Sequence, residues 1–331
     1  MDDLGAAIDA VATETGFSGV VTVTEGDTTV CAAAYGLADR AHGVANTLTT
    51  RFAIASGTKT FTALTVMRLV ESGLADLDTT ARSVLGDDLP LVDDAVTIEH
   101  LLEHRSGIGD YFDEEEIDTE DHVLTVPLHT LDTTEAWLPV IDGHPQVSAP
   151  GSTWAYNNGG YVLLALLAER ISLVPYPALV DELVIAPAGL TATGFHRADT
   201  PTPELAVGYL NDGRTNVLHL PAVGAGDGGL STTAADAQQL WRALIAGDLV
   251  TPATFAAMTR DRTDGAGDGG RGYGLGFWLS PAGDIAMLEG CDAGISFRSA
   301  HPLGTDRTWT VISNSTDGAW PVAKLLAEQV S

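Results

Sequence analysis

Phe52-Ala-Ile-Ala-Ser56-Gly57-Thr58-Lys59 is the stretch of sequence that decides both the fold and the chemistry of this chain. A short apolar run ends at Ser56, and the spacing of apolar residues from Thr60 to Ser72 predicts a buried helix that Gly73 closes. Ser56 and Lys59 lie three residues apart on the first turn of this helix, where positions i and i+3 share a face. The amine of Lys59 can therefore reach the hydroxyl of Ser56.

These two residue types are the ones that nucleophilic catalysis needs. A serine is a poor nucleophile at its own pKa, so a neighbouring base must take its proton. A helix start also offers a backbone N–H to a developing oxyanion. The alternative is an N-capping serine followed by a solvated lysine. Lys59 is one of only two lysines in an arginine-rich chain, and an amine can lose its proton where a guanidinium cannot, which favours a catalytic Lys59.

A second candidate segment, Tyr156-Asn157-Asn158, follows Pro150-Gly151 and precedes the apolar helix expected from Gly159 to Ile171. The phenol of Tyr156 can act as a proton donor or a base. The amide of Asn158 can bond both Lys59 and a substrate carbonyl. The alternative interpretation of this segment is an ordinary turn followed by a helix cap.

Four motifs occur in order along the chain: Ser56-x-x-Lys59, Leu101–Ile108, Tyr156-x-Asn158 and Gly226–Asp236. Together they resemble the serine beta-lactamase-related family, which holds class C beta-lactamases, DD-peptidases, beta-lactamase-like esterases and D-aminopeptidases. Within it the sequence is most similar to soluble serine hydrolases of high-GC organisms. The resemblance implies that Ser56 is acylated and that Lys59 is its base. It also implies Tyr156 as base or leaving-group acid, and Asn158 as the residue that holds Lys59 and the substrate.

The third motif of the family is where this chain departs from the pattern. The resemblance places Lys-Thr-Gly or His-x-Gly, on a strand beside the nucleophile, at residues 289–291, where the sequence has Glu289-Gly290-Cys291, followed by Asp292. In this alignment, Glu289 stands at the position of the motif's lysine or histidine, and Cys291 stands at the position of its final glycine. Glu289 would repel a substrate carboxylate at a cost of about a few kcal/mol, unless it points away and another register supplies the site. These four residues are the predicted substrate-binding positions, with the second oxyanion N–H near Cys291 or Asp292.

The rest of the chain predicts an α/β (α+β) fold of the beta-lactamase/transpeptidase type. Strand-like segments lie near both chain ends: Gly19–Thr24, Thr28–Tyr35, Tyr273–Leu279, Ile285–Leu288, Ile295–Ala300 and Thr308–Ser313. Most of the intervening chain is helical or loop-like in pattern. We therefore expect one antiparallel sheet built from both ends and flanked by helices. Residues 1–74 and 230–331 form this sheet domain, residues 75–229 an inserted helical domain, and the active site lies at their junction.

Composition limits the partners. The net charge is −29, from 45 acidic and 16 basic residues, and such a field repels nucleic acid and anionic membranes. The acidity is spread along the chain, which favours adaptation to high salt, where screening removes self-repulsion. The apolar runs are shorter than the roughly 20 residues of a membrane span. The first residues carry no basic or apolar region typical of a signal peptide, so a cytoplasmic location is expected.

No cofactor or metal is expected. Cys31 and Cys291 are too few for a disulfide framework and are expected to be reduced and mostly buried. His100 and His104 are four residues apart but lack the central glutamate of a zincin helix. The acidic stretch Asp113–Asp121 is expected to be a solvated loop.

The sequence therefore predicts a hydrolase that forms an acyl-enzyme with a small-molecule ester or amide. The predicted substrate lacks a nearby carboxylate, and a substrate that carries an amine is one form of this prediction. Esterase is the first choice. A D-aminopeptidase or amidase, or a beta-lactamase, is the alternative, and a non-catalytic binding or assembly module on the same fold is a rival of another class. The sequence contains no indication of the oligomeric state.

Overall fold

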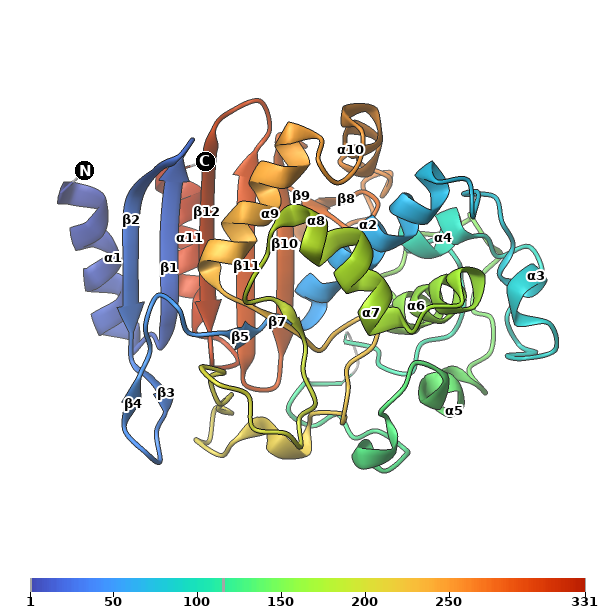
Figure 1. Cartoon of the computed structure of the whole chain (residues 1–331), viewed down its shortest axis with the longest axis horizontal. Helices are drawn as coiled ribbons and strands as arrows, with labels where there is room; N and C mark the ends of the chain where they lie inside the picture. Colours follow the sequence, from blue (N-terminus) through green and yellow to red (C-terminus); the bar gives the residue numbers. More distant parts are fainter. Residues whose placement is uncertain (1, 115–116, 331) are drawn as a thin grey trace.

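The computed structural model describes residues 2–114 and 117–330, and a seven-stranded antiparallel sheet runs through it (Figure 1). The strand order is β2-β1-β12-β11-β10-β9-β8. The bounds are β1 Gly19–Glu25, β2 Thr28–Tyr35, β8 Gly272–Tyr273, β9 Trp278–Leu279, β10 Ile285–Asp292, β11 Ile295–Pro302 and β12 Arg307–Ser313. N-terminal β1 pairs with C-terminal β12 from Gly19–Ser313 to Glu25–Arg307. The predicted sheet from both chain ends is confirmed.

Helices cover both faces of this sheet, since its central strands are apolar on both sides. The helices are α1 (Asp2–Thr15) and α11 (Ala319–Gln329) on one face and α9 (Ala234–Ala246) on the other (Figure 1). In β1, Val21 belongs to the same buried cluster as Ile8 of α1 and Leu326 of α11. Its neighbour Val20 belongs to the core on the opposite face. Burying side chains of this size stabilises the fold by about 1.5–3 kcal/mol each.

One predicted strand is wrong. Residues 273–279 were expected to form a continuous strand, but the chain folds back on itself there as the short hairpin β8–β9, with Gly272 opposite Leu279 and Tyr273 opposite Trp278. Gly276 lies in the turn with a φ of +83°, a conformation that a residue with a Cβ rarely adopts. The consequence is that β9 pairs with β10 only at Ala286 and Met287, and the far half of β10 is left as an open edge.

The middle of the chain is mainly helical, as expected. Its helices, with those that flank it, are α2 Thr58–Glu71, α3 Ala81–Leu85, α4 Ile98–Leu102, α5 Leu138–Ile141, α6 Asn158–Ser172, α7 Tyr176–Val180, α8 Ala186–Ala188 and α10 Pro252–Met258, with a π-helical turn over Asp181–Ile185. Among the described residues no single helix is long and apolar enough to span a bilayer. Only α6 together with Tyr176–Ala188, bent by 83°, passes that test by length and composition.

One small sheet, β5-β7-β6, and one shared core join the middle of the chain to the two ends, and a second small sheet is the hairpin β3–β4. The small strands are β3 Leu37–Asp39, β4 Val44–Ala45, β5 Phe52–Ala53, β6 Gly194–Phe195 and β7 Leu230–Thr232, of which β5, β7 and β6 pair in that order. Leu64 of α2, Leu164 of α6 and Leu240 of α9 belong to one buried cluster. We therefore propose that the predicted domain boundaries near residues 74 and 230 separate groups of helices and strands along the chain, but that the two groups share one hydrophobic core.

Candidate active site

Ser56 lies in a single 3₁₀ turn, η1 (Ala55–Gly57), that leads directly into α2. Ala55, just before it, has a φ of 45°, which is uncommon for a residue with a Cβ. Backbone strain of this kind persists only where the surroundings hold it. Strand β10 lies against this turn: a Cβ added to Gly290 would lie 2.0 Å from the carbonyl oxygen of Ile54 and 2.8 Å from the nitrogen of Ser56. Only a glycine at 290 allows this close backbone contact.

Lys59 is the most deeply buried charged side chain of the site, with 2% of its surface exposed. Its Nζ donates hydrogen bonds to Ser56 Oγ at 2.8 Å and to Asn158 Oδ1 at 2.7 Å. A third bond goes to the backbone carbonyl of Asp227 at 3.2 Å. Burial lowers the pKa of Lys59 below its usual 10.5, and the carboxylates of Asp227 and Glu114 act in the opposite direction. The lowered pKa makes a neutral amine accessible beside Ser56.

Asn158 is the first residue of α6, and its amide is fixed from both sides. Its Nδ2 donates to the carbonyl of Phe112 at 3.1 Å and to Glu114 Oε1 at 2.9 Å, which leaves Oδ1 for Lys59. The Asp110 carboxylate accepts from the backbone N–H of Asn158 at 2.6 Å and from the next N–H at 2.8 Å, so it caps the helix start. Burial raises the pKa of Asp110 to about 6.

Tyr156 lies on the irregular segment before α6, and its side chain lines the same pocket as Ser56. The ring centroid is 4.8 Å from Lys59 Nζ, and the ring stacks on Trp278 at 5.6 Å with an interplanar angle of 19°. Burial, followed by the charge of Glu114, raises the pKa of Tyr156 well above 10. The phenol is therefore neutral at physiological pH and can donate a proton.

Glu289 is ion-paired. One carboxylate oxygen accepts from Arg271 at 2.6 Å, and the other accepts from Arg298, which lies opposite it on β11. The Arg271 guanidinium lies 4.3 Å from the ring centroid of Trp278. The expectation that Glu289 repels a substrate carboxylate treated its charge as unpaired, whereas two guanidinium groups lie against it in the structure.

The glycine of the third motif was expected at position 291, which is a cysteine. In the structure, Gly290 is the residue whose backbone lies against the turn that holds Ser56. Cys291 follows it, and its thiol lies 3.6 Å from the carbonyl oxygen of Thr316. Cys291 and Cys31 are both free thiols, half-buried rather than mostly buried.

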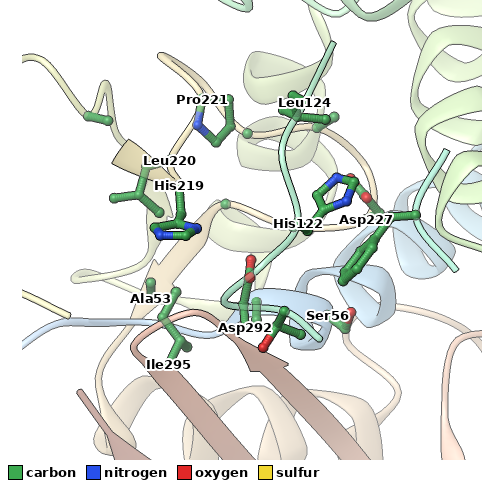
Figure 2. A pocket seen from close by; sticks show the side chains of 18 of the residues that line it. Ala53, Ser56, His122, Leu124, His219, Leu220, Pro221, Asp227, Asp292 and Ile295 are labelled. Atoms are coloured by element: carbon green, nitrogen blue, oxygen red, sulfur yellow. The ribbon is translucent and has the colours of Figure 1, made fainter. Parts of the chain in front are cut away.

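Asp292 ends β10 and lies next to Ser56 at the floor of a cavity (Figure 2). One of its carboxylate oxygens accepts the backbone N–H of Ala293 at 2.7 Å. Burial raises the pKa of Asp292 to about 7, and the negative charges of Glu114 and Asp227 add to the increase. This carboxylate therefore faces the site without the arginine partners that Glu289 has.

Two pockets meet at Ser56, and Glu114 and Cys291 also line both. The apolar pocket, of about 370 Å³, extends between Leu124, Leu128, Leu205, Leu218, Leu220 and Ile295, and Figure 2 shows His122 and His219 opposite Asp292. The aromatic pocket, of about 330 Å³, is lined by Trp154, Tyr156 and Trp278, with Arg271 and Glu289. All eight predicted site residues therefore lie at one place: Ser56, Lys59, Tyr156, Asn158, Glu289, Gly290, Cys291 and Asp292.

Sequence reasoning missed several residues of this site. Asp227 supplies a carbonyl to Lys59, and its carboxylate accepts from the hydroxyl of Tyr111; its place in the Gly226–Asp236 motif was a usable signal. Glu114 bonds Asn158 although its acidic stretch was expected to be only a solvated loop. Residues 115 and 116 of that stretch lie outside the described residues. No local pattern distinguishes Glu114 from its acidic neighbours.

A serine hydrogen-bonded to a buried lysine at one helix start, beside a tyrosine and an asparagine at another, places the protein among the penicillin-recognising serine hydrolases. The beta-lactamase family model matches residues 4–324, and the chain belongs to that family.

Individual relatives agree with this assignment. The chain is 31% identical over 288 residues to the esterase EstB of Burkholderia gladioli. The matched region covers 78% of this chain and 73% of EstB. The chain is 27% identical over 273 residues to PbpX of Bacillus subtilis, which is named as a penicillin-binding protein; this match covers 81% of the chain but spans only 63% of PbpX. The crystal structure of a penicillin-binding protein from Bacillus halodurans superposes with a TM-score of 0.90 at 33% identity, over 97% of this chain and 99% of that one.

Proposed function

We propose that the chain is an acyl-enzyme serine hydrolase, and in the first place an esterase, in which Ser56 attacks the carbonyl carbon of the substrate. The observation that carries this proposal is the 2.8 Å contact between Lys59 Nζ and Ser56 Oγ inside a buried site. Burial lowers the pKa of Lys59. A neutral amine at hydrogen-bond distance is the base that a serine nucleophile needs.

In acylation, Lys59 takes the proton of Ser56 as the bond between Oγ and the carbonyl carbon forms. Tyr156, neutral because it is buried, gives its proton to the leaving oxygen as the bond from that oxygen to the carbonyl carbon breaks. Transfer of the proton on Lys59 to the Tyr156 phenolate restores both groups. Water then attacks the carbonyl carbon of the acyl-enzyme and gives up a proton to the same two groups. The bond from that carbon to Ser56 Oγ breaks as Oγ takes this proton, and the acid leaves.

The developing oxyanion needs two backbone donors, and the contact between β10 and η1 supports Ser56 and Cys291 as their source. The two-residue turn Ala293–Gly294 closes on the pair Asp292–Ile295, which in such a hairpin is a hydrogen-bonded pair. The alternation of an antiparallel ladder then turns the N–H of Cys291 away from β11. It points to the open edge of β10, beside the nitrogen of Ser56.

The two pockets surround different halves of the substrate. Tyr156, the proposed donor to the leaving group, lines the aromatic pocket, and Asn158 lines the apolar pocket. We therefore assign the leaving alcohol to the aromatic pocket and the acyl group to the apolar pocket. Asp292, which lines the apolar pocket beside Ser56, favours acyl groups without a carboxylate, and among these the ones that carry an ammonium near the carbonyl.

That same carboxylate supports the second candidate, a D-aminopeptidase or amidase, because the substrates of such enzymes carry an amine next to the scissile carbonyl. The chemistry would be the same, with Tyr156 protonating a leaving nitrogen instead of an oxygen. A beta-lactamase is a weaker candidate, since its substrates bear a carboxylate. The proposed partner is in each case a small ester or amide.

The test is covalent labelling with a fluorophosphonate, which reacts only with an activated serine. We expect labelling of the native chain and none of Ser56→Ala, which should keep its fold because replacing a serine at a helix start costs only about 1 kcal/mol. Turnover of p-nitrophenyl esters, D-aminoacyl amides and a chromogenic cephalosporin, side by side in high salt, then ranks the activities. A native chain without labelling would favour the non-catalytic module instead, and near-normal activity of Ser56→Ala would exclude Ser56 as nucleophile.

A further inference from the structure

His104 belongs to the motif Leu101–Ile108, to which the chemistry above gives no role. It lies two residues after the end of α4, has 2% of its surface exposed, and has a φ of +57°. A histidine in this left-handed conformation is uncommon. Its ring lies against the rings of four aromatic residues of the site, and the nearest, at 4.4 Å between centroids, is Tyr156.

His104 hydrogen-bonds the residues on both sides of Tyr156. Its carbonyl oxygen accepts the backbone N–H of Ala155 at 2.9 Å. Its Nδ1 accepts the backbone N–H of Asn157 at 3.1 Å. Residues 153–157 form neither helix nor strand, so no regular hydrogen-bond ladder fixes this segment. The two bonds and the ring contact therefore restrain the backbone and the ring of Tyr156 together.

These contacts define the protonation state of His104. Because Nδ1 accepts a hydrogen bond, it carries no proton, and the neutral ring holds its proton on Nε2. Burial, and after it the positive charge of Lys59, lowers the pKa of His104 well below 6.5. Nε2 is buried and has no hydrogen-bond partner among the described residues, with the rings of Tyr161 and Tyr273 at 4.9 and 4.6 Å. Nothing in this arrangement requires the Nε2 proton, whereas Nδ1 makes a specific bond.

We propose that His104 is a positioning residue that holds the hydroxyl of Tyr156 where it can protonate the leaving group. The inference depends on the proposed role of Tyr156 as leaving-group acid. A tyrosine displaced by even 1 Å would still pack in the site but would transfer its proton poorly, because proton transfer needs hydrogen-bond distance. His104 acts through Tyr156 and touches no reacting atom.

The experiment compares two substitutions that separate the ring from the acceptor. His104→Phe keeps an aromatic ring but removes Nδ1, and His104→Asn can keep an acceptor without the ring. Each variant is assayed with esters of one acyl group and alcohols of rising pKa, from p-nitrophenol to ethanol. A p-nitrophenolate leaves without protonation, whereas an ethoxide needs it. We expect His104→Phe to lower kcat/KM for the ethyl ester about 100-fold, and at least tenfold more than for the p-nitrophenyl ester.

The control is Tyr156→Phe, which removes the proton donor itself. In that background His104→Phe should cause no further leaving-group-dependent loss, since there is no hydroxyl left to position. His104→Asn should recover the ethyl ester activity at least partly, and should carry the comparison if His104→Phe does not fold. Equal losses for all esters, an additive effect in the Tyr156→Phe background, or an ethyl ester loss in His104→Asn as large as in Tyr156→Phe would each overturn the inference.

Labelling of Ser56 distinguishes the two levels of the proposal. Fluorophosphonate carries fluoride as its leaving group, which needs no acid, so the reaction reports the Ser56–Lys59 pair alone. A native chain that is not labelled would contradict the proposed function. A native chain that is labelled and hydrolyses esters, with variants that show no leaving-group dependence, would contradict only the role of His104.

Discussion

Removing the charge of Asp292 should make the protein more stable and less selective. The pKa of Asp292 is raised to about 7 in the folded protein, against an ordinary value of 3.8. In the unfolded chain this carboxyl ionises with the ordinary pKa of 3.8. Burying it therefore lowers the free energy of unfolding only at pH values at which the unfolded carboxyl is charged. The penalty is absent below about pH 3.8, grows as the pH rises, and is complete above about pH 7.

The magnitude follows from the same two values. At about 1.4 kcal/mol per pKa unit, their difference sets an upper limit of about 4 kcal/mol. Asp292 is half-buried and faces a cavity that admits solvent, so we expect about 2 kcal/mol in practice. For a chain of this size that is an increase in Tm of about 4 °C for Asp292→Asn at pH 8.5, falling to about 1 °C at pH 4.5.

The assay is thermal unfolding of the native chain and Asp292→Asn between pH 4.5 and 8.5 at fixed high salt. The matched control is Asp78→Asn, which removes an exposed carboxylate distant in sequence from Asp292. Its difference in Tm from the native chain should not change with pH. The same variant should lose about tenfold in kcat/KM for an amine-bearing ester relative to its neutral isostere, which corresponds to about 1.4 kcal/mol. A Tm difference that does not change with pH, or a destabilised variant at pH 8.5, would refute the reasoning.

Three further predictions follow from the site and the composition. Lys59→Arg should be nearly as inactive as Lys59→Ala, at least 100-fold below the native chain in kcat, because a guanidinium cannot accept the Ser56 proton; substantial activity of the arginine variant would leave Lys59 only an electrostatic role. Glu289→Gln should raise relative activity toward carboxylate-bearing esters by about tenfold, because it removes a negative charge from the wall of the aromatic pocket; an unchanged ratio of anionic to neutral esters would mean that the charge at position 289 does not act on the substrate. Tm and activity should both rise from low to molar potassium chloride, since −29 charges repel one another until they are screened; a flat Tm would contradict the adaptation to salt.

Most elements of the fold were predictable because their signals are local. The apolar spacing of α2 and of α6 was readable in the sequence. The strand expected over residues 273–279 failed for the opposite reason. Its residues have strand-forming side chains, but the backbone at Gly276 turns, and that turn leaves the edge of β10 open.

In the site, the charge at Glu289 shows the limit of an argument from one strand. The sequence shows a carboxylate at position 289. It does not show that Arg298, nine residues away, and Arg271, 18 residues away, meet that carboxylate. A similar limit applies to the glycine of the third motif, which was expected at position 291, since only the contact of Gly290 with the backbone of Ser56 shows which residue lies against the nucleophile turn.

The sequence by itself determined the Ser-x-x-Lys and Tyr-x-Asn motifs on which the proposed site depends, and the sheet built from both chain ends. These depend on spacing within a helix turn, on short motifs and on alternating patterns, all of which act over a few residues. Only the tertiary structure decided which charged and polar groups contact one another. It places the Asp292 carboxylate at the apolar pocket and pairs Glu289 with two arginines. It also hydrogen-bonds His104 to the residues on both sides of Tyr156. These contacts join separate elements, 9 and 18 residues apart for the arginines of Glu289, 53 for the bond from Asn157 to His104 and 168 for the bond from Lys59 to Asp227, and no local pattern of residues encodes them.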